Sequence, residues 1–308
     1  MTRAVACAIV LTVMLALFAT PATTRHASAD EPTRFRLFNA MLYKDMPPFG
    51  EKQVVVYEQS FFGAGKLADG IRPSDEGIAQ AVNNARIQQR HSSRPISPFI
   101  ALDLERWPTW PFASQAEHLE SVGHYADTAR RFQQSAREPI CLYSILPTGG
   151  INASTRATKD AALERQFRQA NQATARRLDG IVNALCPQLY SYYRYPLSLG
   201  QSVALNQWKL FATQMITLAR ELAPGLPVYP FVWPQYHHGG NVKDFSFVND
   251  DVWRAQLEHL KTLADGIILW GGYDFGPNQP LAWDEQASWW QVLQETLPQQ
   301  TRRTDKTN

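Results

Sequence analysis

Two carboxylates stand two residues apart at the end of an apolar run in the first half of the chain. The segment Pro98–Phe112 reads PFIALDLERWPTWPF and carries Asp103 and Glu105. Alternate residues of a strand share one face, so both carboxylates are expected to point the same way, roughly 6–7 Å apart. Two such carboxylates repel each other, which should raise the pKa of one of them. A carboxylic acid with a raised pKa is the group that protonates a glycosidic oxygen.

A structural role for this segment is the alternative. Asp103 or Glu105 could pair with Arg106 or with an arginine on a neighbouring strand. Trp107 and Trp110 follow at once, and their rings suit stacking on sugar rings, although ordinary loop packing is the alternative for each. The segment alone leaves both interpretations open.

Later apolar runs also end in aromatic residues. Several aromatic side chains at the carboxyl ends of barrel strands suggest a sugar-binding cleft, where tyrosine hydroxyls could also bind a substrate carbonyl. The candidates are Tyr190, Tyr192 and Tyr193 after one run, Trp233 and Tyr236 after the next, and Trp270, Tyr273 and Asp274 after the last.

The sequence lacks the residue patterns that other catalytic chemistries need. His237 and His238 are adjacent, but a metal site needs more ligands in a fixed geometry, so we interpret them as surface residues. A serine hydrolase would need a Gly-x-Ser-x-Gly elbow, and a nucleotide fold would need a glycine-rich phosphate loop. The sequence has neither pattern. We therefore expect no metal and no cofactor.

Strand-like and helix-like segments alternate along the chain and must position these side chains. The alternation predicts an α/β protein with a parallel sheet, and about seven strands over about 250 residues favour a single TIM-like (β/α) barrel, distorted from the regular form. The predicted strands are Phe35–Phe38, Val54–Tyr57, Pro98–Leu104, Ile140–Ile145, Cys186–Tyr190, Val228–Trp233 and Gly266–Trp270. Six helices are predicted to begin after Ser74, after Ser114 (with a capping box to Glu117), at Asp160, at Ser202, after Asn249 and at Trp283.

The first 29 residues have the layout of a secretory signal peptide. Arg3 precedes the apolar run Ala4–Phe18, and Ala27-Ser28-Ala29 offers a cleavage site. The run is shorter than the ~20 residues that a membrane anchor needs, and no later segment resembles a membrane span. We therefore predict a secreted or periplasmic protein. The expected organisation is a signal peptide over 1–29, one barrel domain over 30–298 and a polar tail over 299–308.

The exported chain is expected to carry no net charge. The full sequence has 308 residues with 30 basic and 28 acidic side chains, and Arg3 and Arg25 leave with the signal peptide. A nucleic-acid-binding protein needs a basic excess, so we expect no such partner. The predicted partner is a polysaccharide or oligosaccharide substrate, and the protein is expected to be a monomer.

Two cysteines remain after the signal peptide, Cys141 and Cys186, and both lie among apolar residues. An exported compartment permits a disulfide between them. Two buried free thiols are the alternative. Their spacing fits no zinc motif.

Four stretches resemble, in order, the hyaluronidase family, glycoside hydrolase family 56. IALDLERWPTW resembles its catalytic strand, with Asp-x-Glu followed by a tryptophan, and RLFNAM resembles its first strand and keeps Asn39. ALCPQLYS resembles its A-L-x-P-S-I-Y segment and places Tyr190 at the active-site tyrosine. GIILWGGYD resembles its G-V-V-L-W strand and places Trp270 at the tryptophan that lines the acetamido pocket.

The resemblance implies a distorted seven-stranded barrel and a retaining, substrate-assisted hydrolysis of a polysaccharide that contains N-acetylhexosamine. Glu105 would be the acid and then the base. Asp103 would orient the 2-acetamido group, whose carbonyl oxygen attacks the anomeric carbon. Tyr190 and Trp270 would position the N-acetyl group.

The sequence also departs from the family. Its fourth strand reads ICLYSILP, so the simplest alignment places Leu146 at a further pocket tyrosine, with Tyr143 as a substitute. The family's cysteine framework and obvious basic residues for a polyanion groove are missing. A neutral or different amino-sugar polymer therefore fits as well as hyaluronan. A barrel that binds sugar without cleaving it, and a chitinase-like Asp-x-Glu hydrolase, are the alternatives.

Overall fold

The computed structural model describes residues 34–63, 72–192, 201–237, 245–274 and 279–302. The compact unit begins at Arg34. The predicted signal peptide, most of the polar tail, Tyr193 and His238 lie outside the described residues.

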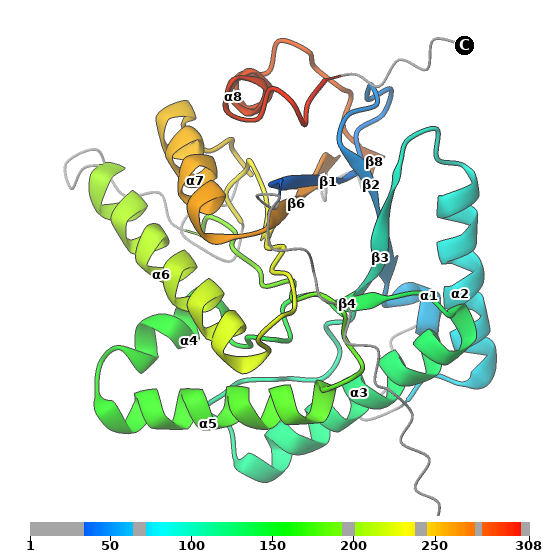
Figure 1. The fold of residues 1–308 in the computed structure, drawn as a ribbon, viewed down its shortest axis with the longest axis vertical. Coiled ribbons are helices and arrows are strands. Elements are labelled where there is room, and N and C mark those ends of the chain that lie inside the picture. The colour runs from blue at the N-terminus through cyan, green and yellow to red at the C-terminus, as the bar shows by residue number, and fades with distance from the viewer. Residues whose placement is uncertain (1–33, 64–71, 193–200, 238–244, 275–278, 303–308) are drawn as a thin grey trace, which may run out of the picture. The chain divides into compact units, whose positions relative to one another are not determined.

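A parallel six-stranded sheet forms the centre of this unit, and helices lie around the outside of the strands (Figure 1). The strand order is β4-β3-β2-β1-β6-β5. The strands are β1 (Arg36–Met41), β2 (Glu51–Tyr57), β3 (Ile96–Asp103), β4 (Ile140–Leu142), β5 (Phe231–Val232) and β6 (Gly266–Gly271). The short strands β7 (Tyr273–Asp274) and β8 (Gln279–Pro280) form a separate antiparallel pair.

Eight helices occur among the described residues. They are α1 (Gln59–Phe62), α2 (Asp75–Arg90), α3 (Gln115–Ala136), α4 (Gly150–Ala157), α5 (Ala161–Leu178), α6 (Gln201–Leu222), α7 (Asp250–Leu263) and α8 (Ser288–Thr296). The six predicted helices are present, although the last begins at Ser288 and not at Trp283, and α1 and α4 were not predicted. The predicted capping box is also present, because the Ser114 hydroxyl accepts from the Glu117 backbone N–H and the Glu117 carboxylate accepts from that of Ser114.

The predicted α/β class and parallel sheet are confirmed, but the expected fifth strand does not form a regular strand. The segment 183–191 instead joins the two edge strands through isolated parallel bridges, Tyr143 to Cys186 on one side and Gln188 to Phe231 on the other. Pro187 lies between these bridges and has no N–H to donate, which interrupts a regular ladder. The six strands and this segment together curl the sheet.

A disulfide links Cys141 and Cys186 across the same junction, with 6.2 Å between their Cα atoms. It ties β4 to the segment 183–191. The alternative that the sequence left open, two free thiols, is therefore wrong.

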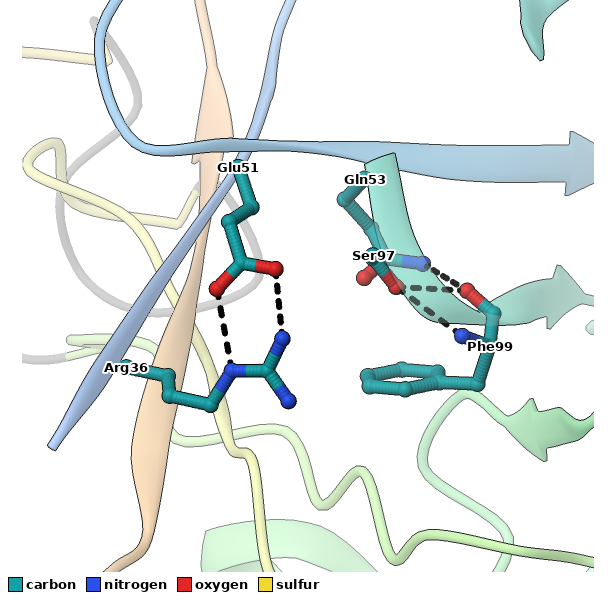
Figure 2. A network of polar contacts seen from close by, with 5 residues as sticks. All are labelled: Arg36, Glu51, Gln53, Ser97 and Phe99. Atoms are coloured by element: carbon teal, nitrogen blue, oxygen red, sulfur yellow. Dashed lines mark hydrogen bonds and ion pairs between the residues drawn. The ribbon is translucent and has the colours of Figure 1, made fainter. Parts of the chain in front are cut away.

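A polar network holds the amino ends of the first three strands (Figure 2). The Arg36 guanidinium donates to both carboxylate oxygens of Glu51, at 2.9 and 2.5 Å. Nearby, the Gln53 amide and the Ser97 hydroxyl both donate to the Phe99 carbonyl. The carboxyl ends of the same strands, at the other end of the sheet, carry the candidate site. No helix in the described part of the chain is long and apolar enough to span a bilayer.

Candidate active site

Alternation along the strands decides which side chains enter the space inside the curled sheet. Phe38, Val55, Ala101 and Ile268 belong to a buried cluster that contains no helix residue, so this cluster fills the interior. Leu37, Val54, Ile100 and Ile267 belong to a second cluster, which includes the buried faces of the helices. A strand has a period of two, so residues two apart continue on the same side.

The last inward-facing side chains of several strands meet in one cavity of about 380 Å³. Tyr57 and Asp103 end β2 and β3 and are paired in register. Trp270 lies near the end of β6 and pairs with Ala40 of β1. The lining residues are Tyr57, Glu58, Gln59, Asp103, Glu105, Tyr143, Tyr190, Trp233, His237 and Trp270.

The two predicted carboxylates both line this cavity, and their environments differ. Asp103 is half-buried, and its buried Oδ1 has no hydrogen-bond partner among the described residues. Burial raises the pKa of Asp103 well above its usual range, and the nearby charges of Glu105 and Glu58 raise it further. Glu105 lies just beyond the strand and is more exposed, and partial burial together with Glu58 raises its pKa. Both carboxyls are therefore biased toward the protonated form.

A third carboxylate, Glu58, contacts the same segment from the end of β2. Its Oε2 accepts from the Glu105 backbone N–H at 3.2 Å, and its Oε1 lies 3.4 Å from Nη2 of Arg106. The Arg106 guanidinium also stacks 4.4 Å from the centre of the Phe62 ring. The arginine that follows the Asp-x-Glu motif therefore pairs with Glu58.

Aromatic rings form one wall of the cavity. The Tyr190 ring stacks on Trp270 with 5.8 Å between centroids, and Trp233 stands edge-on to Trp270 at 4.9 Å. The Trp270 indole N–H donates to the Tyr57 hydroxyl at 3.2 Å. A flat apolar face with a few hydroxyl groups beside it suits the ring of a sugar.

A glutamine links two tyrosines at the edge of this wall. The Gln188 amide N–H donates to the Tyr143 hydroxyl, and the Tyr192 hydroxyl donates to the Gln188 amide oxygen. Burial raises the pKa of Tyr143 and of Tyr190 well above the usual range. Both hydroxyls in the cavity therefore stay neutral hydrogen-bonding groups at physiological pH.

Three predicted site residues lie outside the cavity because of the strand pleat or local packing. Asn39 is on the outward side of β1, where its amide donates to the Phe49 carbonyl and accepts from the Met41 N–H. Trp107 is buried against His124, with 5.2 Å between ring centroids. Tyr236 is buried in the cluster that contains the helix faces.

The other outlying residues are closer to solvent. Trp110 is 38% exposed and packs edge-on against Phe112, so it is not part of the cavity wall. Asp274 is half-buried in β7 and pairs with Gln279 of β8. Tyr192 is not a lining residue of the cavity; its hydroxyl donates to the Gln188 amide oxygen, and its ring lies 4.6 Å from that of His237, which does line the cavity.

The sequence missed four lining residues. Tyr57, Glu58 and Gln59 directly follow the apolar run Val54–Val56, so the strand-end argument applied to Asp103 would also have found them. His237 was interpreted as a surface residue, but its ring stacks on Tyr190 at 5.9 Å and lines the cavity. Among the residues that the structure describes, no group of three or more His, Cys, Asp and Glu side chains could hold a metal ion.

Comparison with known proteins gives a likeness of fold. No family model and no curated protein matches the sequence. The structure resembles that of bee venom hyaluronidase, with a TM-score of 0.51 and 15% identity over 77% of this chain and 91% of that chain. Bee venom hyaluronidase in complex with a hyaluronic acid tetramer gives a TM-score of 0.49 at 15% identity, over 77% and 90% of the two chains. An engineered protein gives a TM-score of 0.43 at 11% identity, over 85% of this chain and 68% of that chain.

The fold therefore falls in the class of curled α/β barrels to which a hyaluronidase, a glycoside hydrolase, also belongs. The likeness is one of backbone fold.

Proposed function

We propose that this protein is an exported, hyaluronidase-like glycoside hydrolase that cleaves a polysaccharide containing N-acetylhexosamine. The observation that carries the proposal is that the Asp103 and Glu105 carboxyls line one cavity together with three aromatic rings. These rings belong to Tyr190, Trp233 and Trp270. Burial and the charge of Glu58 raise the pKa of Glu105, which favours the protonated form that a general acid needs. The layout of the first 29 residues supports the export in this proposal.

The proposed reaction retains the configuration at the anomeric carbon. Glu105 donates its proton to the glycosidic oxygen while the carbonyl oxygen of the substrate's 2-acetamido group attacks the anomeric carbon. The bond to the leaving sugar breaks, and a cyclic oxazolinium forms. Glu105, now a carboxylate, takes a proton from water, the water oxygen attacks the same carbon, and the acetamido group reforms.

Asp103 and the aromatic wall have supporting roles in this reaction. Asp103 accepts from the acetamido N–H and so orients the group for attack on the anomeric carbon. Its buried Oδ1, which has no hydrogen-bond partner in the part of the chain that the structure describes, is the acceptor that this role needs. Tyr190 and Trp270 hold the N-acetyl group between them.

The test is the release of reducing ends by the purified chain from hyaluronan, chondroitin, chitin oligomers and peptidoglycan. We expect cleavage of an acetamido polymer and no cleavage of the same polymer after chemical removal of its N-acetyl groups. Equal cleavage of the deacetylated polymer would contradict the substrate-assisted step. Binding without release would favour a carbohydrate-binding barrel, and cleavage confined to chitin oligomers would favour a chitinase-like specificity.

A further inference from the structure

The cavity contains a third carboxylate that the proposed reaction does not use. Glu58 lies directly after β2 and lines the cavity with Asp103 and Glu105. Its two oxygens face two consecutive residues, the backbone N–H of Glu105 and the guanidinium of Arg106. The side chain therefore spans the two residues that follow the end of β3 by two and three positions.

We propose that Glu58 is a positioning residue that fixes the backbone of Glu105 at the cavity and adds a negative charge beside the acid. This inference rests on the proposed function, in which Glu105 is the acid and base. Glu105 lies beyond the last residue of β3, so no ladder hydrogen bond of the strand holds it. The bond from its N–H to Glu58 at 3.2 Å supplies a fixed point in place of the ladder.

The ion pair with Arg106 keeps Glu58 in this place. The Arg106 side chain is only 8% exposed and lies over the Phe62 ring, which follows Glu58 in the short helix α1. The arginine is thus held on one side by the carboxylate and on the other by the ring. Solvent screens a partly buried pair of this kind less than it would screen a surface pair.

The charge of Glu58 acts on the groups around it. It raises the pKa of both Glu105 and Asp103, since a neighbouring negative charge disfavours ionisation. Arg106 pairs with Glu58, and the charge of Glu58 is also one of the causes that raise the pKa of Tyr125 of α3. The other titratable side chains that line the cavity are Tyr57, Tyr143, Tyr190 and His237.

The first test is a titration of the Glu105 carboxyl by carbon NMR in the full-length mature chain, without substrate. The Glu105 resonance is assigned by its loss in Glu105→Gln. In Glu58→Gln, which keeps the size and an acceptor oxygen, we expect the pKa of Glu105 to fall. The matched control is Glu51→Gln, which neutralises a carboxylate at the opposite end of the same strand, where it pairs with Arg36 (Figure 2). An unchanged Glu105 titration in Glu58→Gln would overturn the inference.

Kinetics give the second readout. The acid must be protonated, so the alkaline limb of kcat/KM should move to lower pH in Glu58→Gln and stay in place in Glu51→Gln. A merely structural role would lower the rate at every pH and leave the limb unmoved. If the wild-type chain cleaves no polymer, the proposed function fails while the titration still decides the role of Glu58.

A second variant covers the case in which Glu58→Gln does not fold. Glu58→Asp keeps the charge but is one methylene shorter, so its carboxylate should no longer reach the Glu105 N–H. We expect kcat to fall by about tenfold or more with the alkaline limb near its wild-type position. A wild-type kcat in Glu58→Asp would overturn the positioning role.

Discussion

Tyr57 and Asp103 occupy paired positions at the ends of the neighbouring strands β2 and β3, and both side chains line the same cavity. The pairing places a hydroxyl beside a carboxyl whose pKa is raised by burial. The Tyr57 hydroxyl also accepts from the Trp270 indole, so one register pair connects the carboxylate side of the cavity to its aromatic wall. Strand register therefore positions much of the candidate site.

Asp103→Asn should increase the free energy of unfolding at neutral pH while it removes activity. The native state raises the pKa of Asp103, so it holds a proton that the unfolded chain releases above its ordinary pKa of about 4. Stability contributed by this group is therefore lost as the pH rises above that value, until the native carboxyl itself ionises. Asparagine does not ionise and avoids this loss.

Urea unfolding between about pH 4 and pH 8 measures this difference. The advantage of Asp103→Asn over the wild type should grow as the pH rises through this range. An advantage that is absent or shrinks with rising pH would show that Asp103 does not hold its proton in the native state.

Gln188→Leu should destabilise the protein by about 1–3 kcal/mol, because it leaves two tyrosine hydroxyls without their amide partner. The two are Tyr143, which lines the cavity, and Tyr192. Tyr192→Phe is the matched control, since it removes one of the two bonds and should cost about half as much. Denaturant unfolding of both variants is the measurement, and equal costs would argue against a role for Gln188 in holding Tyr143.

Reduction of the disulfide between Cys141 and Cys186 should destabilise the protein by about 4 kcal/mol, the chain-entropy value for a loop of this length. The two cysteines are 45 residues apart in the sequence, and the bond joins β4 to the segment 183–191. Unfolding midpoints with and without reductant, and for the double alanine variant, measure the effect. A midpoint that reductant leaves unchanged would refute it.

Gly271→Ala should displace the Trp233 ring and weaken substrate binding. A Cβ at Gly271 would lie 2.6 Å from Trp233, and the residue has a φ of +135° that side chains rarely adopt. Gly225→Ala is the matched control, because its φ is +90° but no atom lies within 4 Å of the added Cβ. We expect altered tryptophan fluorescence and a higher KM in Gly271→Ala alone. The same fluorescence change in Gly225→Ala would mean that backbone strain, not the contact, is the cause.

Local patterns made much of the fold predictable. The helices that begin after Ser74, Ser114 and Asp160 are each capped by the side chain of that residue, which accepts from a backbone N–H two or three residues further on. All three caps are present. Apolar runs between them located the six strands. The fifth run fails as a strand because Pro187 interrupts it, and the sequence could have signalled that.

The side of the sheet on which a residue lies was harder to predict. The strands are apolar on both faces, so their composition does not distinguish inward from outward positions. Asn39 was therefore predicted to be a site residue although the pleat turns it outward. Glu58 was missed although it accepts from the Glu105 backbone N–H between the ends of neighbouring strands. Such contacts depend on register between segments far apart in the sequence.

The most direct test of the central claim compares the wild type with Glu105→Gln in the release of reducing ends from the acetamido polymer that the wild type cleaves. Circular dichroism should show the same fold, and Glu51→Gln should retain wild-type activity. We predict a rate about 10²–10⁴-fold lower in Glu105→Gln, because the variant keeps the side-chain volume and loses the proton. A rate within a few-fold of the wild type in a clean preparation would contradict the assignment of Glu105 as the acid.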